Sequence, residues 1–178
     1  LFSATEDYNY YGGWKSDGTE VGTVEVKHID LNYTLQFIQV DDTFYFQGAD
    51  NTLNGIEIWE TDGTAENTFL TADINHKGSN IYPTFLTQLN DKSIMLSNNG
   101  LNGREPFVTD GTINGTKMLK DITTPIGNSS SNFSEDPGFY FKKAGDNVFF
   151  GASNSSHGFE IYKTDGTEEN TIMVKDIA

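Results

Sequence analysis

The chain has 178 residues, and its 26 Asp and Glu against 11 Lys and Arg give a formal net charge of −15. So acidic a surface lacks the basic face that nucleic-acid binding requires, and it disfavours docking on anionic lipid. Cysteine is absent, which excludes disulfides, thiolate metal sites and a cysteine nucleophile. The longest apolar runs are a few residues, far below the roughly 20 that a membrane-spanning helix needs, so no membrane insertion is expected.

One tripeptide recurs along the chain. Asp-Gly-Thr occurs four times, at spacings of 45, 48 and 55 residues. A unit that recurs at such a period is the sequence signature of a repeat protein, so we expect these residues to form one structural turn in each repeat. The copies are Asp17, Gly18 and Thr19; Asp62, Gly63 and Thr64; Asp110, Gly111 and Thr112; Asp165, Gly166 and Thr167.

The same residue types flank each copy. Five positions before the Asp stands a Glu, at positions 57, 105 and 160, whereas the first copy has Gly12. Four positions after the motif Thr stands a second Thr, preceded by Gly22, Asn67, Gly115 or Asn170. Three positions before the Asp stands an aromatic residue, and we expect these aromatics to pack in the core: Trp14, Trp59, Phe107 and Tyr162.

This pattern has the chemistry of a hairpin turn. An Asp carboxylate can accept hydrogen bonds from backbone amides two residues on. Gly and Asn are the residues that accept positive φ, so we expect the residue before the closing Thr to adopt a left-handed conformation. Each motif is therefore predicted to join two antiparallel strands, and the repeated Glu is interpreted as an acceptor for nearby backbone amides.

Strands are predicted in chain order from short runs of aromatic and β-branched residues between turn residues. In residues 1–29, Leu1-Phe2 aligns with the second strand of the later repeats, and two strands follow, one around Trp14 and one over 24–29. In residues 30–74 the predicted strands are 37–40, 44–46, a strand around Trp59, and 69–74.

The last two repeats follow the same scheme. Residues 75–122 contain runs at 85–89, 94–96, around Phe107 and at 117–122. Residues 123–178 contain runs at 139–141, 148–150, around Tyr162 and at 172–177. Polar connections over 30–35, 75–83 and 123–137 separate the repeats.

The expected fold class is all-β. Four antiparallel strands in a unit of about 45 residues form the blade of a β-propeller. We therefore predict a propeller segment with three complete blades, over 30–74, 75–122 and 123–178, and most of a fourth over 1–29. All four would belong to one propeller domain that is a fragment of a longer one; a self-contained four-bladed ring is the alternative.

The motif with its flanks resembles a known bacterial repeat. Residues 57–68 and 160–177 are similar to the Glu-Leu-Trp-x-x-Asp-Gly-Thr-x-x-Gly-Thr repeat of large exported proteins of Bacteroidetes and other surface-adhering bacteria. The resemblance implies a propeller-like β-fold on a secreted or cell-surface protein, often beside adhesive modules and a C-terminal secretion-sorting (type IX) domain. It brings no catalytic residues, and the first copy departs most, with Gly12-Gly13-Trp14 in place of Glu-Leu-Trp.

Calcium is the metal that the sequence favours, because hard cations bind several carboxylate and carbonyl oxygens. Asp50, Asn54 and Glu57 offer three oxygen ligands in one loop and are the best local candidates. Their spacing matches neither the EF-hand loop nor the β-roll nonapeptide, so no cofactor is assigned. The three histidines, His28, His76 and His157, have no paired spacing that predicts zinc.

No catalytic constellation emerges from the sequence: no serine stands in Gly-x-Ser-x-Gly, and no carboxylate pair is singled out. The expected function is that of a non-catalytic structural and binding module of an exported bacterial surface protein, in adhesion or protein–protein contact. Expected partners are other blades or domains of the same protein, surface proteins and glycans. The alternatives are part of a carbohydrate-active propeller enzyme with its catalytic residues elsewhere, or a calcium-stabilised spacer.

Overall fold

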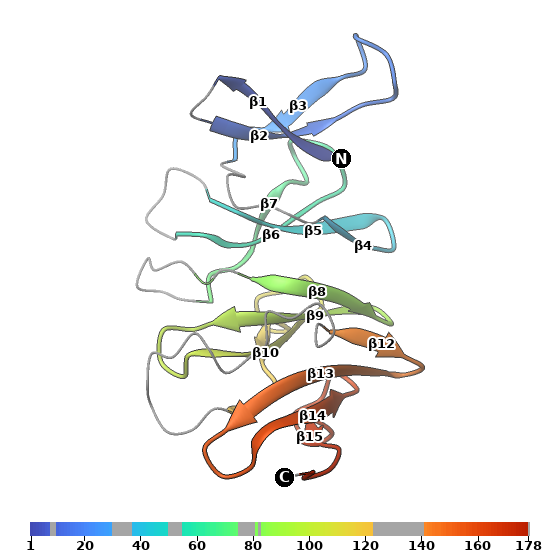
Figure 1. Cartoon of the computed structure of the whole chain (residues 1–178). Helices are drawn as coiled ribbons and strands as arrows, with labels where there is room; N and C mark the ends of the chain where they lie inside the picture. The colour runs from blue at the N-terminus through green and yellow to red at the C-terminus, as the bar shows by residue number, and fades with distance from the viewer. Residues whose placement is uncertain are drawn as a thin grey trace. The chain divides into compact units, whose positions relative to one another are not determined.

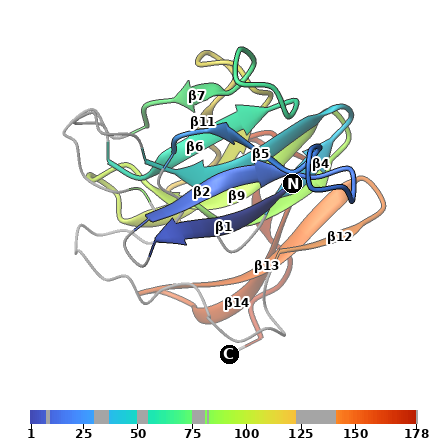
Figure 2. The same cartoon turned by 90° about the horizontal axis from the view of Figure 1, so that it is seen from above.

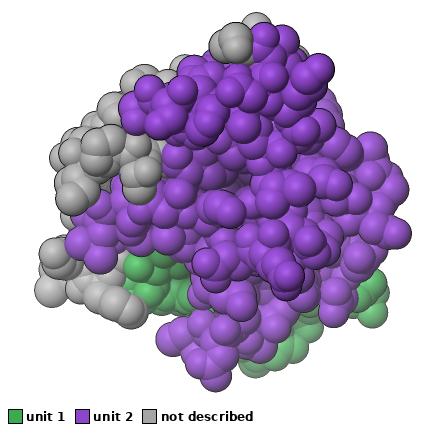
Figure 3. Space-filling view, turned by 90° about the horizontal axis from the view of Figure 1, so that it is seen from below, with its two compact units in different colours: residues 1–82 green, residues 83–178 purple. Residues whose placement is uncertain are grey.

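The computed structural model describes residues 1–7, 10–29, 37–49, 55–74, 81, 83–122 and 141–177. These residues form antiparallel β-sheets joined by turns, with no helix among them, so the predicted all-β class is confirmed. Accordingly, the described part of the chain holds no helix able to cross a membrane. The chain divides into two compact units, residues 1–82 and 83–178, which are green and purple in Figure 3.

Unit 1 contains two sheets in which each strand pairs with its neighbour along the chain (Figure 1). The three-stranded sheet, whose strands β1 and β2 are drawn in dark blue in Figure 2, has the order β1-β2-β3. The four-stranded sheet has the order β4-β5-β6-β7. The strand bounds are β1 Phe2–Asp7, β2 Tyr10–Lys15, β3 Val24–Lys27, β4 Ile38–Val40, β5 Thr43–Gly48, β6 Glu57–Thr61 and β7 Phe69–Ala72.

Unit 2 contains two four-stranded sheets, β8-β9-β10-β11 and β12-β13-β14-β15. All their pairings are antiparallel, so each sheet is an up-and-down meander. The bounds are β8 Thr84–Leu89, β9 Lys92–Asn98, β10 Arg104–Thr109, β11 Lys117–Met118, β12 Lys142–Ala144, β13 Asn147–Asn154, β14 Gly158–Thr164 and β15 Ile172–Met173.

Two-residue turns join the first two strands of each four-stranded sheet and fix their register. The first turn residue has positive φ in each case: 53° at Asp41, 57° at Asn90 and 59° at Gly145. Such a residue matches the twist of the flanking strands in a tight hairpin. In the last sheet this turn pairs Ala144 with Asn147. The first strand therefore lies at 142–144, not at the predicted 139–141, of which 139 and 140 lie outside the described residues.

The last strand of each sheet is shorter than predicted, ending at Lys27, Ala72, Met118 and Met173. The prediction extended these strands to the isoleucines at 29, 74, 122 and 177. In the last three repeats the amide of that isoleucine donates to a glutamate side chain instead of a neighbouring strand. The alternating apolar pattern thus continues past the point where the backbone ladder ends.

The core of unit 2 lies between its two sheets. One buried cluster combines Leu89, Ile94, Leu96, Val108 and Leu119 of the first sheet region with Val148, Phe150, Ala152 and Tyr162 of the second. The Phe150 ring lies 4.8 Å from that of Phe141 and 5.9 Å from that of Tyr162, between ring centroids. Because alternate residues of a strand point to one face, the two sheets pack face to face through these positions.

Unit 1 is built in the same way. Ile29, Phe46 and Trp59 form its buried cluster, with Phe37 and Leu70 packed against it. Lys27 from the three-stranded sheet donates through Nζ to the Thr68 carbonyl of the four-stranded sheet, and the same ammonium lies 5.9 Å from the centroid of the Trp59 ring. Sheet-on-sheet packing therefore recurs in both units.

Candidate functional site: the repeated turn and the surface beside it

The motif Asp is held by its own turn in all four copies. Its Oδ1 accepts a hydrogen bond from the backbone amide of the motif Thr at 2.9–3.0 Å and from the hydroxyl of the same Thr at 2.7 Å. These are charge-assisted bonds within one turn. They lower the pKa of Asp17, Asp62, Asp110 and Asp165, with the Thr hydroxyl as the largest cause in each.

A pair of hydroxyls closes the base of each turn. The residue before the motif Asp bonds to the closing Thr seven positions later, at 2.6–2.8 Å between their oxygens. In the second copy, Thr68 gives its only hydroxyl proton to the Thr64 carbonyl, so Thr61 is the donor in the Thr61–Thr68 pair. Thr61 in turn accepts from the Gly63 amide at 2.9 Å.

The turn pattern predicted from the sequence assigns no role to the residue before the motif Asp. Its hydroxyl is nevertheless present in every copy, as Ser16, Thr61, Thr109 and Thr164. That recurrence is the signal that could have identified it. The complete unit is thus an eight-residue turn, Ser/Thr-Asp-Gly-Thr-x-x-Gly/Asn-Thr. Its side chains form hydrogen bonds to one another and to the backbone amides of the turn.

The expectation of a left-handed residue before the closing Thr is wrong. The residue with positive φ is the glycine of Asp-Gly-Thr, at 91° in Gly18, 90° in Gly63, 84° in Gly111 and 88° in Gly166. The residue before the closing Thr is instead restricted by its contact with the motif Asp. A Cβ added at Gly22 would lie 2.0 Å from Asp17 Oδ1, whereas Asn67 Nδ2 donates to Asp62 Oδ2 at 2.7 Å.

The motif glycine also meets the preceding sheet. Lys15 Nζ, from β2, donates to the Gly63 carbonyl at 2.7 Å. In unit 2, a Cβ added at Gly166 would lie 3.7 Å from side-chain atoms of Leu89 and Ile94. Gly18 belongs to the first sheet of the chain, and an added Cβ there would have nothing within 4 Å. The turn therefore serves both its own hairpin and the stacking of sheets.

Replacing Gly18 or Gly63 with Ala is expected to cost a similar free energy of unfolding, about 1–2 kcal/mol each, because both need a left-handed backbone. At Gly63 the added Cβ would only touch Lys15 Cδ at 3.9 Å, an ordinary contact. Urea unfolding followed by the fluorescence of Trp14 and Trp59, both in unit 1, measures the two losses. A loss at Gly63 several times that at Gly18 would show that packing, not backbone conformation, selects glycine there.

The repeated glutamates are buried and end the last strands. Glu57 and Glu105 are 0% exposed and Glu160 is 3% exposed. Each accepts a hydrogen bond from the backbone amide of an isoleucine 17 residues later: Ile74 at 3.1 Å, Ile122 at 2.8 Å and Ile177 at 3.0 Å. Each carboxylate thus accepts a hydrogen bond from an amide that lies after the last strand of its sheet. In the three four-stranded sheets, this bond connects the third strand to the segment that follows the fourth.

Two of the repeat aromatics, Trp59 and Tyr162, belong to the buried clusters between the sheets of their own units. Trp59, Phe107 and Tyr162 are buried, at 3–5% exposure. Trp14, on the first sheet, is only half-buried. Burial raises the pKa of the Tyr162 hydroxyl, which accepts a hydrogen bond from Asn154 Nδ2 at 2.9 Å. Three of the four aromatics are therefore inaccessible to a sugar ligand in this chain.

The calcium candidates fall largely outside the described residues. This applies to Asp50 and Asn54, whereas Glu57 is described and is the buried acceptor for Ile74. Among the described residues there is no group of three or more His, Asp or Glu side chains arranged to hold a metal. His76 is also outside them, His28 lies 3.6 Å from Glu25, and His157 bonds to Asn154.

A polar groove of about 240 Å³ lies in unit 2, beside two of the repeated turns. Lys92 and Lys117 line it together with Asp110, and Gly166 and Thr167 of the last sheet close one side. The nearby Lys92 ammonium contributes to the lowered pKa of Asp110, after the larger effect of the Thr112 hydroxyl. The groove thus offers ammonium donors and carboxylate acceptors at one surface, a set suited to binding polar groups.

Two neighbouring carboxyls of unit 1 are expected to respond to pH with opposite signs. Burial raises the pKa of Glu60, and the hydrogen bonds of its turn, led by the Thr64 hydroxyl, lower the pKa of Asp62. The stability from Asp62 is present above about pH 4, the ordinary range of Asp, and is lost as the pH falls through the lowered value. Folding favours the protonated form of Glu60. The stability that this form contributes is lost as the pH rises through the raised pKa of Glu60.

Glu60→Gln is therefore expected to stabilise unit 1 at neutral pH and to lose this advantage in acid. Asp62→Asn is expected to destabilise unit 1 at neutral pH, with the difference from the wild type vanishing below the lowered pKa of Asp62. Urea midpoints measured from neutral pH to about pH 2 test both variants, because this range extends below the ordinary pKa values of Asp and Glu. Parallel pH profiles for the two variants would contradict the assignment.

Comparison with known proteins gives no family for this chain. No protein-family model matches it, and no curated protein is significantly similar to it.

Proposed function

We propose that this chain is a segment of a β-propeller that acts as a non-catalytic structural and binding module. Its sheets are antiparallel meanders of three or four strands that follow one another along the chain. Within each unit, consecutive sheets pack face to face through the repeat aromatics and their neighbours. Radial stacking of such sheets is the architecture of propeller blades.

The observation that carries this proposal is that the recurring polar residues are used internally. The motif Asp bonds to its own turn in every copy, and the repeated Glu accepts an isoleucine amide in three copies. Catalytic groups instead hold their polar atoms toward a substrate. The recurring part of the sequence therefore builds and stacks the sheets, and the side chains that differ between repeats are left to contact partners.

The acidic charge of −15 and the lack of cysteine suit an exported protein whose fold depends on packing alone. Together with the repeat resemblance, they support a place on a bacterial surface or in the secreted fraction. There the chain would bind other domains of its own protein, surface proteins or glycans, and so contribute to adhesion.

A binding assay and a turnover assay on the same polysaccharides test this proposal. We expect retention of the chain on immobilised surface glycans without release of reducing sugar. Lys117→Ala, in the groove, should weaken retention, and Lys143→Ala, exposed on β12, serves as the matched control. Sugar release by the wild type would favour the carbohydrate-active enzyme, and no retention on any glycan would confine the module to protein partners.

A further inference from the structure

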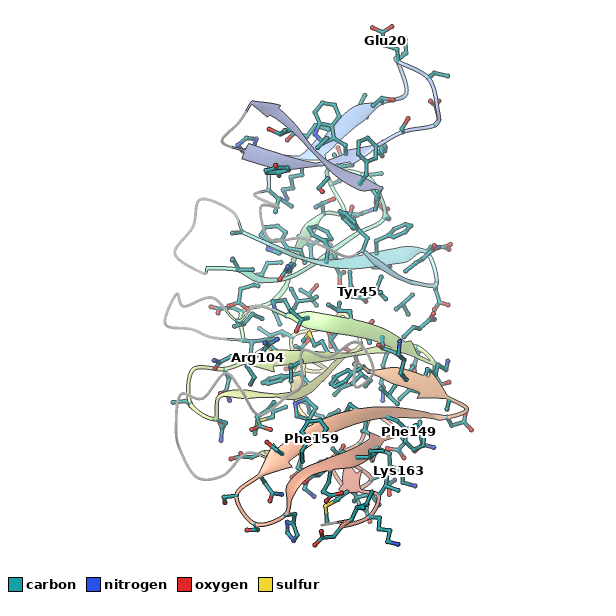
Figure 4. All side chains as sticks on the ribbon, in the orientation of Figure 1. Glu20, Tyr45, Arg104, Phe149, Phe159 and Lys163 are labelled. Carbon is teal, nitrogen blue, oxygen red and sulfur yellow. The ribbon has the colours of Figure 1, made fainter. Side chains whose placement is uncertain are left out.

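The polar groove of unit 2 lies between two consecutive sheets, β8-β9-β10-β11 and β12-β13-β14-β15. The two sheets are drawn in green to yellow and in orange in Figure 4. Both walls belong to unit 2, so the groove is formed within one compact unit. The first sheet lines it with Lys92, Val108, Asp110, Asn114, Gly115 and Lys117, and the second with Gly166, Thr167 and Glu168.

Two lysines distinguish the third repeat from the others at this groove. Lys117 follows the closing Thr of its turn, where the other repeats have apolar residues that are 40–45% exposed: Val24, Phe69 and Ile172. Lys92 follows the two-residue turn between the first two strands, where the other four-stranded sheets have Thr43 and Asn147. A chain with only 11 Lys and Arg thus places two cations at one groove, at positions that are uncharged in the other four-stranded sheets.

These two ammonium groups are available to a ligand. Lys15 and Lys27 of unit 1 each donate to a backbone carbonyl of the neighbouring sheet. Among the described residues, by contrast, neither Lys92 nor Lys117 forms a hydrogen bond or a close ion pair, and Lys92 only contributes its charge to nearby Asp110. An ammonium group has three donors, and its bonds to a carboxylate are stronger than neutral ones. The pair is therefore suited to hold an anionic oxygen.

The motif Asp of this repeat also retains an acceptor atom. In the second and fourth copies, Oδ2 of the Asp accepts from the Asn before the closing Thr at 2.7 Å. The third copy has Gly115 there, and no described side chain donates to Asp110 Oδ2. An added Cβ at Gly115 would lie 2.3 Å from this oxygen. The glycine thus leaves Asp110 Oδ2 able to accept a hydrogen bond from a ligand in the groove.

The charges of the groove select a ligand with one negative charge and several hydroxyls. Lys92 and Lys117 can bind a carboxylate, whereas Asp110 and Glu168 would repel further negative charge and instead accept from hydroxyl donors. This balance disfavours phosphate, which carries more than one charge. The only apolar side chain of the lining is that of Val108, which is 2% exposed, so an apolar peptide side chain would find little to pack against.

Size and net charge narrow the ligand further. The groove volume of about 240 Å³ is several times the roughly 30 Å³ that one water occupies in the liquid, which leaves room for a sugar ring. The net charge of −15 repels a polyanion such as a polyuronate. An isolated acidic residue in an otherwise neutral glycan avoids this repulsion.

We propose that the groove binds a single uronic acid residue of an otherwise neutral glycan. Lys92 and Lys117 hold its carboxylate, and Asp110 Oδ2 accepts a hydrogen bond from a ring hydroxyl. This inference rests on the proposed function as a binding module, and it adds the chemical class of the glycan and the residues that recognise it.

Chemical-shift titration of the isotope-labelled chain with four small probes tests the proposal. Methyl glucuronide should shift the amide signals of Gly115 and Gly166 in a saturable manner. Glucuronamide and methyl glucoside lack the negative charge, so they should bind at least about fivefold more weakly, since both ion pairs are lost. N-acetylglycine has a carboxylate but no ring hydroxyl for Asp110, and it should also bind more weakly.

Variants of the groove identify the groups that bind. Lys92→Gln and Lys117→Gln should each weaken methyl glucuronide binding by about two- to fivefold, the effect of losing one exposed ion pair. Lys143→Gln removes the same charge from an exposed position on β12 and should bind like the wild type.

A further variant tests the acceptor without removing a charge. Gly115→Asn introduces the donor that Asn67 gives to Asp62, so Asp110 should rearrange and use Oδ2 within the turn. Binding should weaken by about two- to tenfold, the effect of losing one hydrogen bond. Gly22→Asn makes the same change in the turn of the first repeat, outside the groove, and should leave binding unchanged.

The possible outcomes separate this inference from the proposed function. Equal binding of the glucuronide and the glucoside overturns the acidic specificity and leaves the binding module in place. Equal binding of N-acetylglycine, or unchanged binding by both lysine variants, overturns the assignment of the groove as a sugar site. A chain that responds to none of the probes also overturns it, and the retention assay on immobilised glycans then decides separately whether the module binds glycans through another surface.

Discussion

Phe150→Ala is expected to lower the free energy of unfolding of unit 2 by about 3–5 kcal/mol, the usual cost of emptying a buried aromatic site. Phe150 is 2% exposed and lies between the rings of Phe141 and Tyr162, with centroids 4.8 and 5.9 Å away. Both neighbours lose contact at once, at the place where the two sheets of unit 2 meet. Urea unfolding followed by circular dichroism measures the loss.

Phe159→Ala is the matched control on the same sheet. Phe159 points to the opposite face of the sheet and is 42% exposed, so its truncation removes less buried surface and should cost only about 1–2 kcal/mol. Hydrogen exchange of peptides from β13 and β14 should accelerate strongly in the Phe150 variant and little in the Phe159 variant. Equal losses in the two variants would contradict the assignment of one buried and one exposed face to this sheet.

Glu105→Ala is expected to cost about 1–3 kcal/mol, the penalty for leaving a buried amide without its acceptor. Glu105 is 0% exposed and accepts from the Ile122 amide at 2.8 Å. Ile122 is itself 5% exposed, which leaves water little access to the amide. The loss should appear as a lower urea midpoint of unit 2 and as faster exchange of the Ile122 amide.

Two further variants separate the hydrogen bond from the charge. Glu105→Gln keeps an acceptor oxygen and removes a buried charge, so its stability should stay within about 1 kcal/mol of the wild type. Glu160→Ala removes the same contact in the last repeat, where Ile177 is 72% exposed; water can then bond to the freed amide and the loss should be smaller. A Gln variant as unstable as the Ala variant would show that the negative charge itself is required at this position.

The strands and turns could largely be predicted from the sequence, because both depend on neighbours along the chain. In the motif, Asp62, Thr64, Asn67 and Thr68 bond to one another within seven residues of Thr61. The wrong inference concerned conformation within this turn. Gly and Asn both tolerate a left-handed backbone, which is why Gly22 and Asn67 were predicted to adopt one. Both residues also fit beside the side chain of the motif Asp, and the residue types alone do not show which of these two reasons applies.

What only the tertiary structure decided is which residues meet across sheets and which faces remain exposed. The hydroxyl at Ser16, Thr61, Thr109 and Thr164 recurs in the sequence, but its role appears only when the closing Thr is folded back onto it. Likewise, Ile94 and Phe149 occupy one repeat position, yet Ile94 is 0% exposed and Phe149 is half-buried. The repeat determines the strand and its side chain, whereas burial depends on whether another sheet packs against that face.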